Sequence, residues 1–308
     1  MSAPLVEATQ LTKRFEEFTA VDHIDFTVEA GEAFGFLGPN GAGKSSTMRM
    51  IGAVSPVSSG SLTVLGLDPA DHGAEIRARL GVVPQEDNLD NELPVEENLL
   101  IYGRYFDLSR KVLRPRIEEL LDFAQLTERR TSKVESLSGG MRRRLTIARS
   151  LINQPELILL DEPTTGLDPQ ARHALWDRLY RLKRDGVTLI ITTHYMDEAE
   201  QLCDRLVVMD NGAIVAEGSP LALIAEHSTK EVVELRFRIG EQEAIVDRLD
   251  GIAKRLEALP DRVLLYTDDG DTAVAIIHER GIHPESVVVR RSTLEDVFLR
   301  LTGRSLID

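Results

Sequence analysis

The sequence is poor in cysteine and in positive charge. Cys203 is the only cysteine among 308 residues, so no disulfide can form within the chain, as is typical of a reducing compartment. In the run AEQLCDRL we expect Cys203 to be a small buried apolar side chain rather than a reactive thiol. Lysine and arginine number 36 against 51 acidic residues, which gives a net charge of −15. Because nucleic acid is a polyanion, this charge argues against nucleic-acid binding.

Long hydrophobic runs are also missing. Segments such as ELILL and VTLIITT have the length of a strand, well short of the roughly 20 apolar residues that a membrane helix needs. The beginning of the chain, MSAPLVEATQLTKRF, has no apolar core of a secretory signal. We therefore expect a soluble chain, or one that is peripheral to a membrane. Apolar residues make up 42% of the sequence, which suffices for one large domain or two ordinary ones.

Strand and helix patterns alternate over the first part of the chain, which predicts an α/β domain with a largely parallel sheet. We expect this domain to cover 1–222, with a helical subdomain at about 88–150. A hairpin is predicted over 207–218, turned at 210–212. The other main predicted elements are strands at 32–37, 157–160 and 187–192 and helices at 45–53 and 172–185.

A change of pattern follows Gly218, Ser219 and Pro220, which punctuate the chain. We expect a linker at 223–230 and a small α+β domain at 231–308. Its predicted order is β-α-β-β-α-β, the ferredoxin-like order. The predicted elements are a strand from Val233 to Ile239 with one face in water, a helix at 242–249, strands at 252–258 and 262–268, a helix at 272–280 and a strand at 286–291.

The last predicted element is a helix in STLEDVFLRLTG. Ser292 and Glu295 have the spacing of a capping box, and Gly303 is a plausible stop. Leu294, Val297, Phe298 and Leu301 share one face of this helix. The face could pack within the domain or bind a partner, and the sequence favours neither.

A phosphate-binding loop is the strongest local motif. GPNGAGKS fits the pattern G-x-x-x-x-G-K-[ST], with a strand predicted before it and a helix after it. Glycines let main-chain N–H groups converge on phosphate oxygens, and the helix presents its positive end to the same anion. We expect Lys44 to reach the β- and γ-phosphates, Ser45 to ligate Mg²⁺ and Ser46 to meet an α-phosphate. The loop comprises Gly38, Pro39, Asn40, Gly41, Ala42, Gly43, Lys44, Ser45 and Ser46.

Two acids end the apolar strand of LILLDEP. Ligands bind at the carboxyl ends of parallel strands, and adjacent side chains of a strand diverge. Asp161 is thus placed to hold Mg²⁺ and Glu162 to act as the base that polarises an attacking water. The plain alternative is an acidic cap between strand and loop, which the phosphate loop makes the weaker interpretation.

Three single residues give weaker signals. Gln85, in GVVPQED, could bridge Mg²⁺ or the attacking water to a moving segment, or it could be an ordinary surface residue. His194, at the end of IITTH, could donate to a γ-phosphate, although such a histidine is usually structural. Phe15 could stack on an adenine ring or pack in the core, and Phe18 competes for the stacking role.

The stretch LSGGM begins another predicted helix. Ser138 can cap this helix, whose N-terminal N–H groups and dipole would face an anion. Arg142, Arg143 and Arg144 follow directly. We expect them to form a solvated run of charges. The alternative is that one of them steadies the LSGGM loop or a partner acid. The predicted apolar stripe of the helix is Met141, Leu145, Ala148 and Ile152.

Together and in this order, these motifs resemble the ATP-binding subunits of ABC transporters, from about Val6 to Gly218. The resemblance implies that Phe15 stacks on adenine, Gly38–Ser46 bind the phosphates, and Ser45, Gln85 and Asp161 hold magnesium. It further implies that Glu162 is the catalytic base, His194 the switch histidine, and Asp168, in GLDP, an acid of the loop that faces a second subunit. These roles rest on the family pattern, and the matching residues are Phe15, Lys44, Ser45, Gln85, Asp161, Glu162, Asp168 and His194.

In this family two subunits meet head to tail, and the LSGG of each caps the ATP bound by the other. The resemblance thus gives Ser138, Gly139 and Gly140 a role at the partner's nucleotide. Met141 stands where many members have glutamine. NLDNELPVEENLLIYGRYF and STLEDVFLRLTGR resemble in particular the ATPases of nodulation lipo-oligosaccharide exporters and daunorubicin-type drug exporters, which use a separate permease chain.

The resemblance implies an ATPase at the cytoplasmic face of the cell membrane. Its partners would be a second copy and an integral-membrane permease, with ATP and Mg²⁺ as cofactors and no nucleic acid. The expected cargo is a drug, as in multidrug efflux and antibiotic resistance, or a lipid or glycolipid. Two alternatives are an ABC-type ATPase that acts on ribosomes or DNA and an unrelated phosphate-loop enzyme such as a kinase. LSGGM and GLDP argue against the kinase, and the sequence does not identify the cargo.

Overall fold

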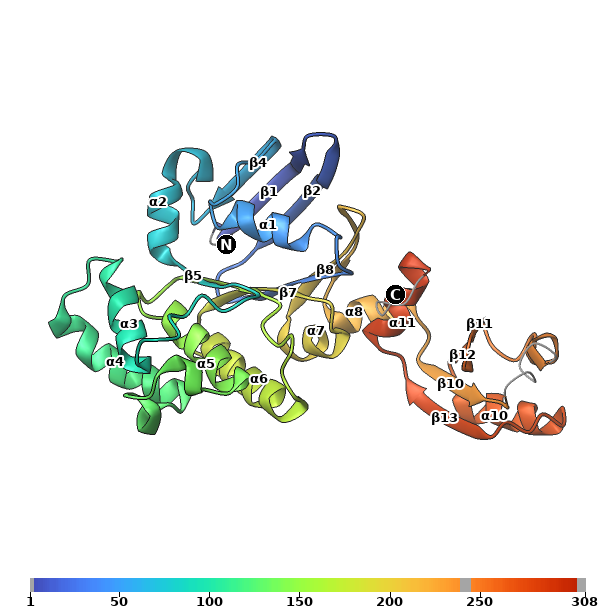
Figure 1. The fold of residues 1–308 in the computed structure, drawn as a ribbon. Helices are drawn as coiled ribbons and strands as arrows, with labels where there is room; N and C mark the ends of the chain where they lie inside the picture. Colours follow the sequence, from blue (N-terminus) through green and yellow to red (C-terminus); the bar gives the residue numbers. More distant parts are fainter. Residues whose placement is uncertain (1–2, 239–244, 304–308) are drawn as a thin grey trace. The chain divides into compact units, whose positions relative to one another are not determined.

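The computed structural model describes residues 3–238 and 245–303, which fall into two compact units (Figure 1). Unit 1 is Met1–Ser219 and unit 2 is Pro220–Asp308. Helix α8 covers Pro220–His227, so most of the predicted linker at 223–230 is helical and belongs to unit 2. Among the described residues, no helix combines the length and the apolar character that crossing a bilayer requires.

A six-stranded sheet forms the centre of unit 1. Its order is β5-β6-β7-β3-β8-β9, and every pair is parallel except the β8–β9 hairpin. The predicted largely parallel sheet is therefore confirmed. The inner strands are continuous apolar runs because helices and a second sheet cover both faces. The strands are β3 Ala33–Leu37, β5 Leu80–Val83, β6 Leu157–Asp161, β7 Thr188–Thr193, β8 Arg205–Asp210 and β9 Ala213–Gly218.

A second, antiparallel sheet of three strands accompanies the first, and the prediction did not include it. Its order is β2-β1-β4, and Val6 of β1 pairs with both Val28 and Val64. Polar residues alternate with buried ones along these strands, which is the pattern of a sheet with one face in the core. The strands are β1 Val6–Phe15, β2 Phe18–Val28 and β4 Ser59–Val64.

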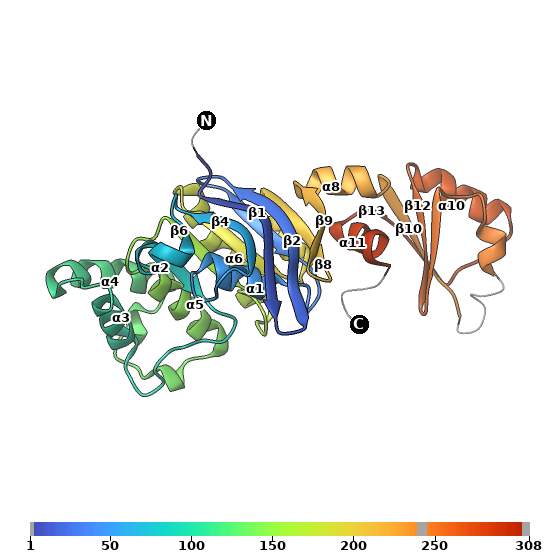
Figure 2. The same cartoon turned by 90° about the horizontal axis from the view of Figure 1, so that it is seen from above.

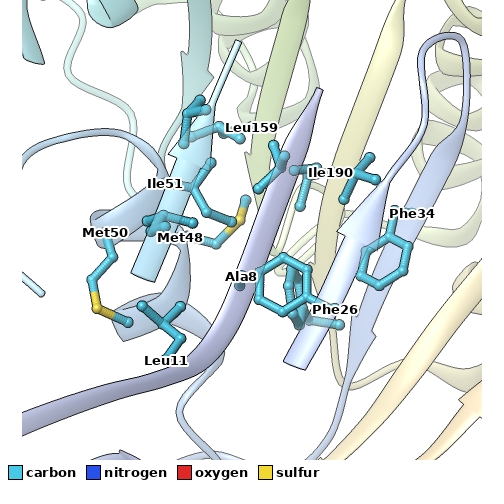
Figure 3. Close-up of a cluster of buried hydrophobic side chains, with 14 of the residues drawn as sticks. Ala8, Leu11, Phe26, Phe34, Met48, Met50, Ile51, Leu159 and Ile190 are labelled. Atoms are coloured by element: carbon cyan, nitrogen blue, oxygen red, sulfur yellow. The ribbon is translucent and has the colours of Figure 1, made fainter. Parts of the chain in front are cut away.

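The largest described core cluster of unit 1 lies between the two sheets (Figure 3). Phe26 of β2 meets Phe34 and Phe36 of β3, with ring centroids 5.9 and 5.1 Å apart. Met48 and Ile51, from the helix after the phosphate loop, fill the same layer. Each such buried side chain contributes about 1.5–3 kcal/mol. The phosphate loop is consequently anchored to a rigid core on both sides.

Helices cover both faces of the six-stranded sheet. In Figure 1, α1 lies on the face that carries the three-stranded sheet, whereas α5, α6 and α7 lie on the other. The helices α3, α4 and α5 pack against one another and form the helical subdomain. The helices of unit 1 are α1 Lys44–Ile51, α2 Pro69–Arg79, α3 Val95–Arg104, α4 Arg110–Ala124, α5 Gly139–Ser150, α6 Pro169–Arg184 and α7 Met196–Leu202, with 3-10 turns at Thr127–Arg129 and Val134–Ser136.

Unit 2 holds a four-stranded antiparallel sheet of order β11-β12-β10-β13. Figure 2 shows β10, β12 and β13 of this sheet. The four strands follow the predicted chain order, so a small α+β domain is confirmed. The first predicted helix, 242–249, lies partly outside the described residues, and Asp247–Leu249 forms a 3-10 turn. The remaining elements are β10 Glu231–Arg236, β11 Arg255–Leu259, β12 Arg262–Thr267, α10 Gly270–Glu279, β13 Ser286–Arg291 and α11 Leu294–Thr302.

The first strand of the domain ends at Arg236, which is exposed, so its predicted wet face is confirmed there, and Ile239 lies outside the described residues. Val232, before the predicted start of the strand, is fully buried and packs with Leu299 of α11. One prediction about unit 2 is wrong. The cap of α11 is Thr293, one residue after the predicted Ser292. Asp296, also fully buried, accepts the N–H of Thr293 at 2.8 Å, which fixes the box one residue further along the chain.

Candidate functional site

The phosphate loop connects β3 to α1. Gly41 and Gly43 have φ values of 83° and 102°, which an L side chain rarely adopts. A Cβ at Gly43 would lie 2.5 Å from the carbonyl oxygen of Ala20, so this position also lacks the space for a side chain. Among the described residues, no side chain forms a hydrogen bond that caps the start of α1. The first N–H groups of this helix are thus not used by a cap, and a helix N-terminus of this kind suits an anion.

Lys44 is folded back over this loop. Its Nζ donates to the carbonyl oxygens of Gly38 at 2.7 Å and Pro39 at 3.0 Å, and the side chain is buried. Burial lowers the pKa of Lys44, against the opposing effects of Glu162 and Asp161. A phosphate would give this desolvated ammonium a charged partner in place of two neutral carbonyls.

The side chains of Ser45, in the first turn of α1, and Asp161, at the end of β6, lie close together. The Ser45 hydroxyl donates to Asp161 Oδ1 at 3.2 Å, and Thr192 of β7 donates to the same oxygen. A cavity of about 530 Å³ is lined by Ser45, Asp161 and Gln85, among others. Hydroxyl, carboxylate and amide oxygens are the donors that Mg²⁺ accepts, so this donor set fits the predicted metal.

Glu162 follows β6 and stands in the left-handed region, with φ 45°. Such a conformation in a residue other than glycine costs about 1–3 kcal/mol and is concentrated at functional sites. Its carboxylate is only 7% exposed. Four side chains surround it: Gln85 Nε2 and Thr165 Oγ1 donate at 3.1 Å each, His194 Nδ1 lies at 3.2 Å and Lys44 Nζ at 3.9 Å.

These contacts determine the charge of the carboxyl. The His194 imidazole is the largest cause that lowers the pKa of Glu162; burial opposes it, and Lys44 and Thr165 add to the lowering. Glu162 is therefore ionised at neutral pH and can accept a proton from a water. The structure brings Lys44, Gln85, Glu162 and His194, which are far apart in the sequence, into one cluster.

Thr165 and Thr192 complete this cluster, and neither was predicted to belong to the site. Thr165 donates to Glu162, and Thr192 donates to Asp161. In the sequence, Thr165 stands three residues after Glu162, and Thr192 ends a predicted strand two residues before His194. That proximity is a signal, although threonine is common at such positions for structural reasons.

The LSGGM stretch, residues 137–141, which we call the signature segment, lies at the start of α5. Ser138 accepts the N–H of Met141 at 3.3 Å and thus caps the helix as predicted. A Cβ built on Gly140 would lie 3.3 Å from Ala171 of α6, whose N-cap is Asp168. None of the hydrogen bonds and ion pairs found among the described residues joins this segment to the phosphate loop of the same chain.

Phe15 ends β1 and is 48% exposed, with Lys13 Nζ 4.8 Å from its ring centroid. The alternative interpretation of Phe15 as a core residue is therefore wrong. Phe18 is more exposed still, at 61%. Both rings are accessible to a ligand, and the stacking of Phe15 on adenine stays a prediction.

The arginine run after the signature is not uniformly solvated. Arg143 is only 6% exposed and donates to main-chain carbonyl oxygens, whereas Arg142 and Arg144 are partly exposed. The predicted solvated run is thus wrong for Arg143. Cys203 is buried, as expected, and burial raises the pKa of its thiol.

Two family models match the chain. The model "ABC transporter" matches residues 21–165, and the model "Nodulation factor export protein NodI, C-terminal domain" matches residues 241–303. One solved structure, of an ATP-binding subunit of an ABC transporter, has 30% identity and a TM-score of 0.66, and covers 72% of this chain and 92% of its own. A dimeric ATP-binding cassette in a post-hydrolysis state, bound to ADP and Pi, has 28% identity and a TM-score of 0.63, with coverages of 70% and 98%.

Curated relatives match over their full length. The Nod factor export ATP-binding protein I of Ralstonia nicotianae is 45% identical over 311 residues, which cover 100% of this chain and 96% of the relative. That of Rhizobium sp. strain N33 is 45% identical over 306 residues, with 99% of each chain covered. The chain therefore belongs to the ABC transporter ATP-binding proteins, which are ATPases, and within them to the family of the Nod factor export ATP-binding proteins.

Proposed function

We propose that this protein drives the export of a lipo-oligosaccharide of the Nod factor type through a separate membrane permease. The observation that carries the proposal is the end-to-end similarity to Nod factor export ATP-binding proteins, which includes the C-terminal domain. Drug efflux and antibiotic resistance have no support among these relatives. The names of these relatives describe export, and they give no support to an ATPase that acts on ribosomes or DNA.

The phosphate loop and Lys44 bind the triphosphate in this proposal. Main-chain N–H groups of Gly38–Ser46 surround the phosphates, and Lys44 leaves its two carbonyl partners for the β- and γ-phosphates. Phe15 stacks on the adenine ring. Ser45, Gln85 and Asp161 hold Mg²⁺, which neutralises phosphate charge when it is bound.

Glu162 is the base that polarises the attacking water. Its carboxylate is ionised, nearly buried and 3.9 Å from Lys44, so it faces the end of the bound triphosphate. Gln85 and Thr165, which donate to this carboxylate, orient it. His194 Nδ1 lies near the other carboxylate oxygen of Glu162, Oε1, and can donate to the γ-phosphate in place of this contact.

The complete site needs a second copy of the chain. The N-terminus of α5, with Ser138, Gly139 and Gly140, does not bind the ATP held by the phosphate loop of its own chain in this proposal. A head-to-tail dimer would place it on the partner's ATP. Asp168 begins α6 beside this segment and would face the other subunit. A dimeric ATP-binding cassette among the structural neighbours supports this arrangement.

A permease helix docks, in this proposal, in the cavity near Gln85. The cavity is bordered by α1, α2 and the segment after β5, and it is lined by both apolar and polar residues. Glu86, at its edge, begins an acidic run that extends to Glu97 and could steer a basic helix. This docking would place the protein peripherally at the cytoplasmic face of the membrane.

Cargo-stimulated ATPase activity tests the function. We expect the protein, reconstituted in vesicles with its membrane permease, to hydrolyse ATP several-fold faster when a lipo-oligosaccharide is added, because cargo and ATP act on one coupled cycle. Glu162→Gln in the same vesicles is the control for contaminating ATPases. Stimulation by drug-like cations alone, with none by the lipo-oligosaccharide, would contradict the proposed cargo.

A further inference from the structure

Arg143 uses its whole guanidinium on main-chain carbonyls. Nε donates to Pro163 O at 2.6 Å, and Nη1 donates to Pro84 O and Gln85 O at 2.5 and 3.2 Å. Nη2 donates to Asp161 O and Glu162 O, both at 3.1 Å. The five acceptors belong to two segments: 84–85, directly after β5, and 161–163, which begins at the last residue of β6.

The two segments carry Gln85 and Glu162, the side chains that orient and polarise the attacking water in the proposed function. Gln85 lies in the segment after β5, and Glu162 lies in the segment after the neighbouring parallel strand β6. Arg143 itself belongs to α5, the helix that begins with the signature segment. One side chain thus ties three parts of the site together: the signature helix, the Gln85 segment and the Glu162 segment.

The guanidinium is charged and almost sealed from water. Burial lowers the pKa of Arg143 to about 10, which leaves the group protonated at neutral pH; the acids Glu198 and Asp161 are the largest opposing causes. Removing a charge from water costs several kcal/mol unless polar groups replace the solvent. The five carbonyl dipoles replace it, so the side chain has little freedom to leave this position.

Two further arginines of α5 hold the same segment. Arg149 Nη1 donates to Asn88 O at 2.6 Å, and Arg142 Nε lies 3.6 Å from Asp87 Oδ2. Residues 85–88 are therefore attached to α5 at three positions. Of these three arginines, Arg143 alone has a hydrogen bond to the Glu162 segment among the contacts of the described residues.

We propose that Arg143 is a positioning residue for ATP hydrolysis, which holds the main chain of Gln85 and Glu162 in register with the signature helix. The proposal rests on the role of Glu162 as the base. Through this connection, a displacement of α5 when the signature segment meets the partner's ATP moves the carbonyls beside the catalytic carboxylate. Arg143 thus links the two nucleotide sites of a dimer without touching either nucleotide.

An arginine suits this position in a way that lysine does not. The planar guanidinium carries five N–H donors in a fixed fork, which can reach two separate segments at once. A lysine ammonium has three donors on one nitrogen atom, so it would keep the charge but could not reach both segments at once. Arg143→Lys therefore separates the loss of geometry from the loss of charge.

The test compares the kinetics of Arg143→Lys with those of the wild-type protein. We expect kcat for ATP hydrolysis to fall at least ~10-fold, because a displacement of about 1 Å at the reacting groups can cost far more than that. We expect the KM for ATP to change less than about threefold, since Lys44 and the phosphate loop keep their contacts. Arg143→Gln, which avoids burying an ammonium, should show the same split and covers the case in which the lysine variant does not fold.

Arg178→Lys is the matched control. Arg178 is also 6% exposed and donates to main-chain carbonyls, those of Phe123 and Ala174, but neither borders Glu162. Its variant should lose thermal stability with kcat per folded protein within about twofold of the wild type. A kcat for Arg143→Lys within twofold of the wild type, or an equal fall in both variants, would overturn the proposal.

A double-mutant cycle examines the route of the effect. If Arg143 acts through the Gln85 segment, Arg143→Lys should reduce kcat much less in a Gln85→Ala background than in the wild type. Full additivity would overturn this route. The assignment of the base is checked separately: wild-type activity in Glu162→Gln would refute the proposed function, whereas an inactive Glu162→Gln with an active Arg143→Lys would refute only the role of Arg143.

Discussion

Glu162 owes its chemistry to side chains that the sequence places far from it. His194 comes from the end of β7, Gln85 from the segment after β5 and Lys44 from the start of α1. All three lie within 3.9 Å of its carboxylate. Glu162 also has a left-handed backbone, with φ 45°. In the proposed function, Asp161 holds the metal and Glu162 polarises the water, as diverging side chains at a strand end allow.

The pH dependence of the reaction should respond to His194. A carboxyl with a lowered pKa stays charged to lower pH, and activity that needs the charged form is lost as the pH falls through that pKa. His194→Ala removes the largest cause of the lowering at Glu162. We expect the acidic limb of kcat/KM against pH to move to higher pH in this variant, measured on its residual activity.

His173→Ala is the control for the loss of a histidine. His173 lies on α6 with its Nδ1 2.7 Å from the carbonyl oxygen of Pro169, outside the contacts of Glu162. Its pH profile should coincide with that of the wild-type protein. An acidic limb that stays in place in His194→Ala would show that the imidazole does not set the charge of the base.

At the scale of elements, β3 depends on a close approach to the segment before β8. Gly35 lies in the middle of β3, and a Cβ there would stand 2.7 Å from Cys203 Sγ and 3.0 Å from Leu206 Cβ. The strand leads straight into the phosphate loop, so its position in the sheet fixes the loop. The single cysteine thus has a packing role, beside the smallest residue of the strand.

Gly35→Ala should destabilise the protein by about 1–3 kcal/mol, the usual cost of overpacking a dense core. Urea unfolding of the variant and the wild type measures this difference. Cys203→Ala in the Gly35→Ala background should restore part of the loss, because it removes the nearer of the two clashing atoms. Equal destabilisation with and without Cys203 would contradict this contact as the cause.

At the scale of the whole molecule, one chain supplies two half-sites that do not meet. The phosphate loop, Asp161 and Glu162 form one, and the start of α5 with Ser138 forms the other. In the proposed function, isologous pairing of two copies would complete both sites at once. Unit 2 has its own core, in which the sheet is covered by α10 on one face and by α11 on the other.

The composite site predicts an ATP-dependent dimer. Glu162→Gln keeps the shape of the side chain and removes the base, so we expect ATP with Mg²⁺ to convert this variant into a stable dimer during gel filtration. Ser138→Arg in the same background should stay monomeric, because the long side chain would fill the space of the partner's ATP at the start of α5 and the capping hydroxyl is lost. A Glu162→Gln protein that remains monomeric at saturating ATP would contradict the composite site.

The sequence by itself determined the local motifs. The phosphate loop is a contiguous run whose glycines have a stereochemical reason, and Asp161 and Glu162 follow directly from a buried strand. Continuous apolar runs predicted the parallel sheet, whose strands are buried on both faces. Alternating apolar residues predicted the small second domain, since burial of one face leaves its period in the chain. The signature cap at Ser138 was predicted for the same reason, because capping involves only neighbouring residues.

Only the tertiary structure decided which of the polar residues meet. The sequence pattern of Arg142–Arg144 is that of an exposed helix, and Arg143 is buried only because the ends of β5 and β6 converge on α5. Val232 is buried because α11 returns to its sheet from 60 residues further on in the chain. Contacts between distant segments leave no period in a sequence, since their partners are fixed by the fold and not by spacing.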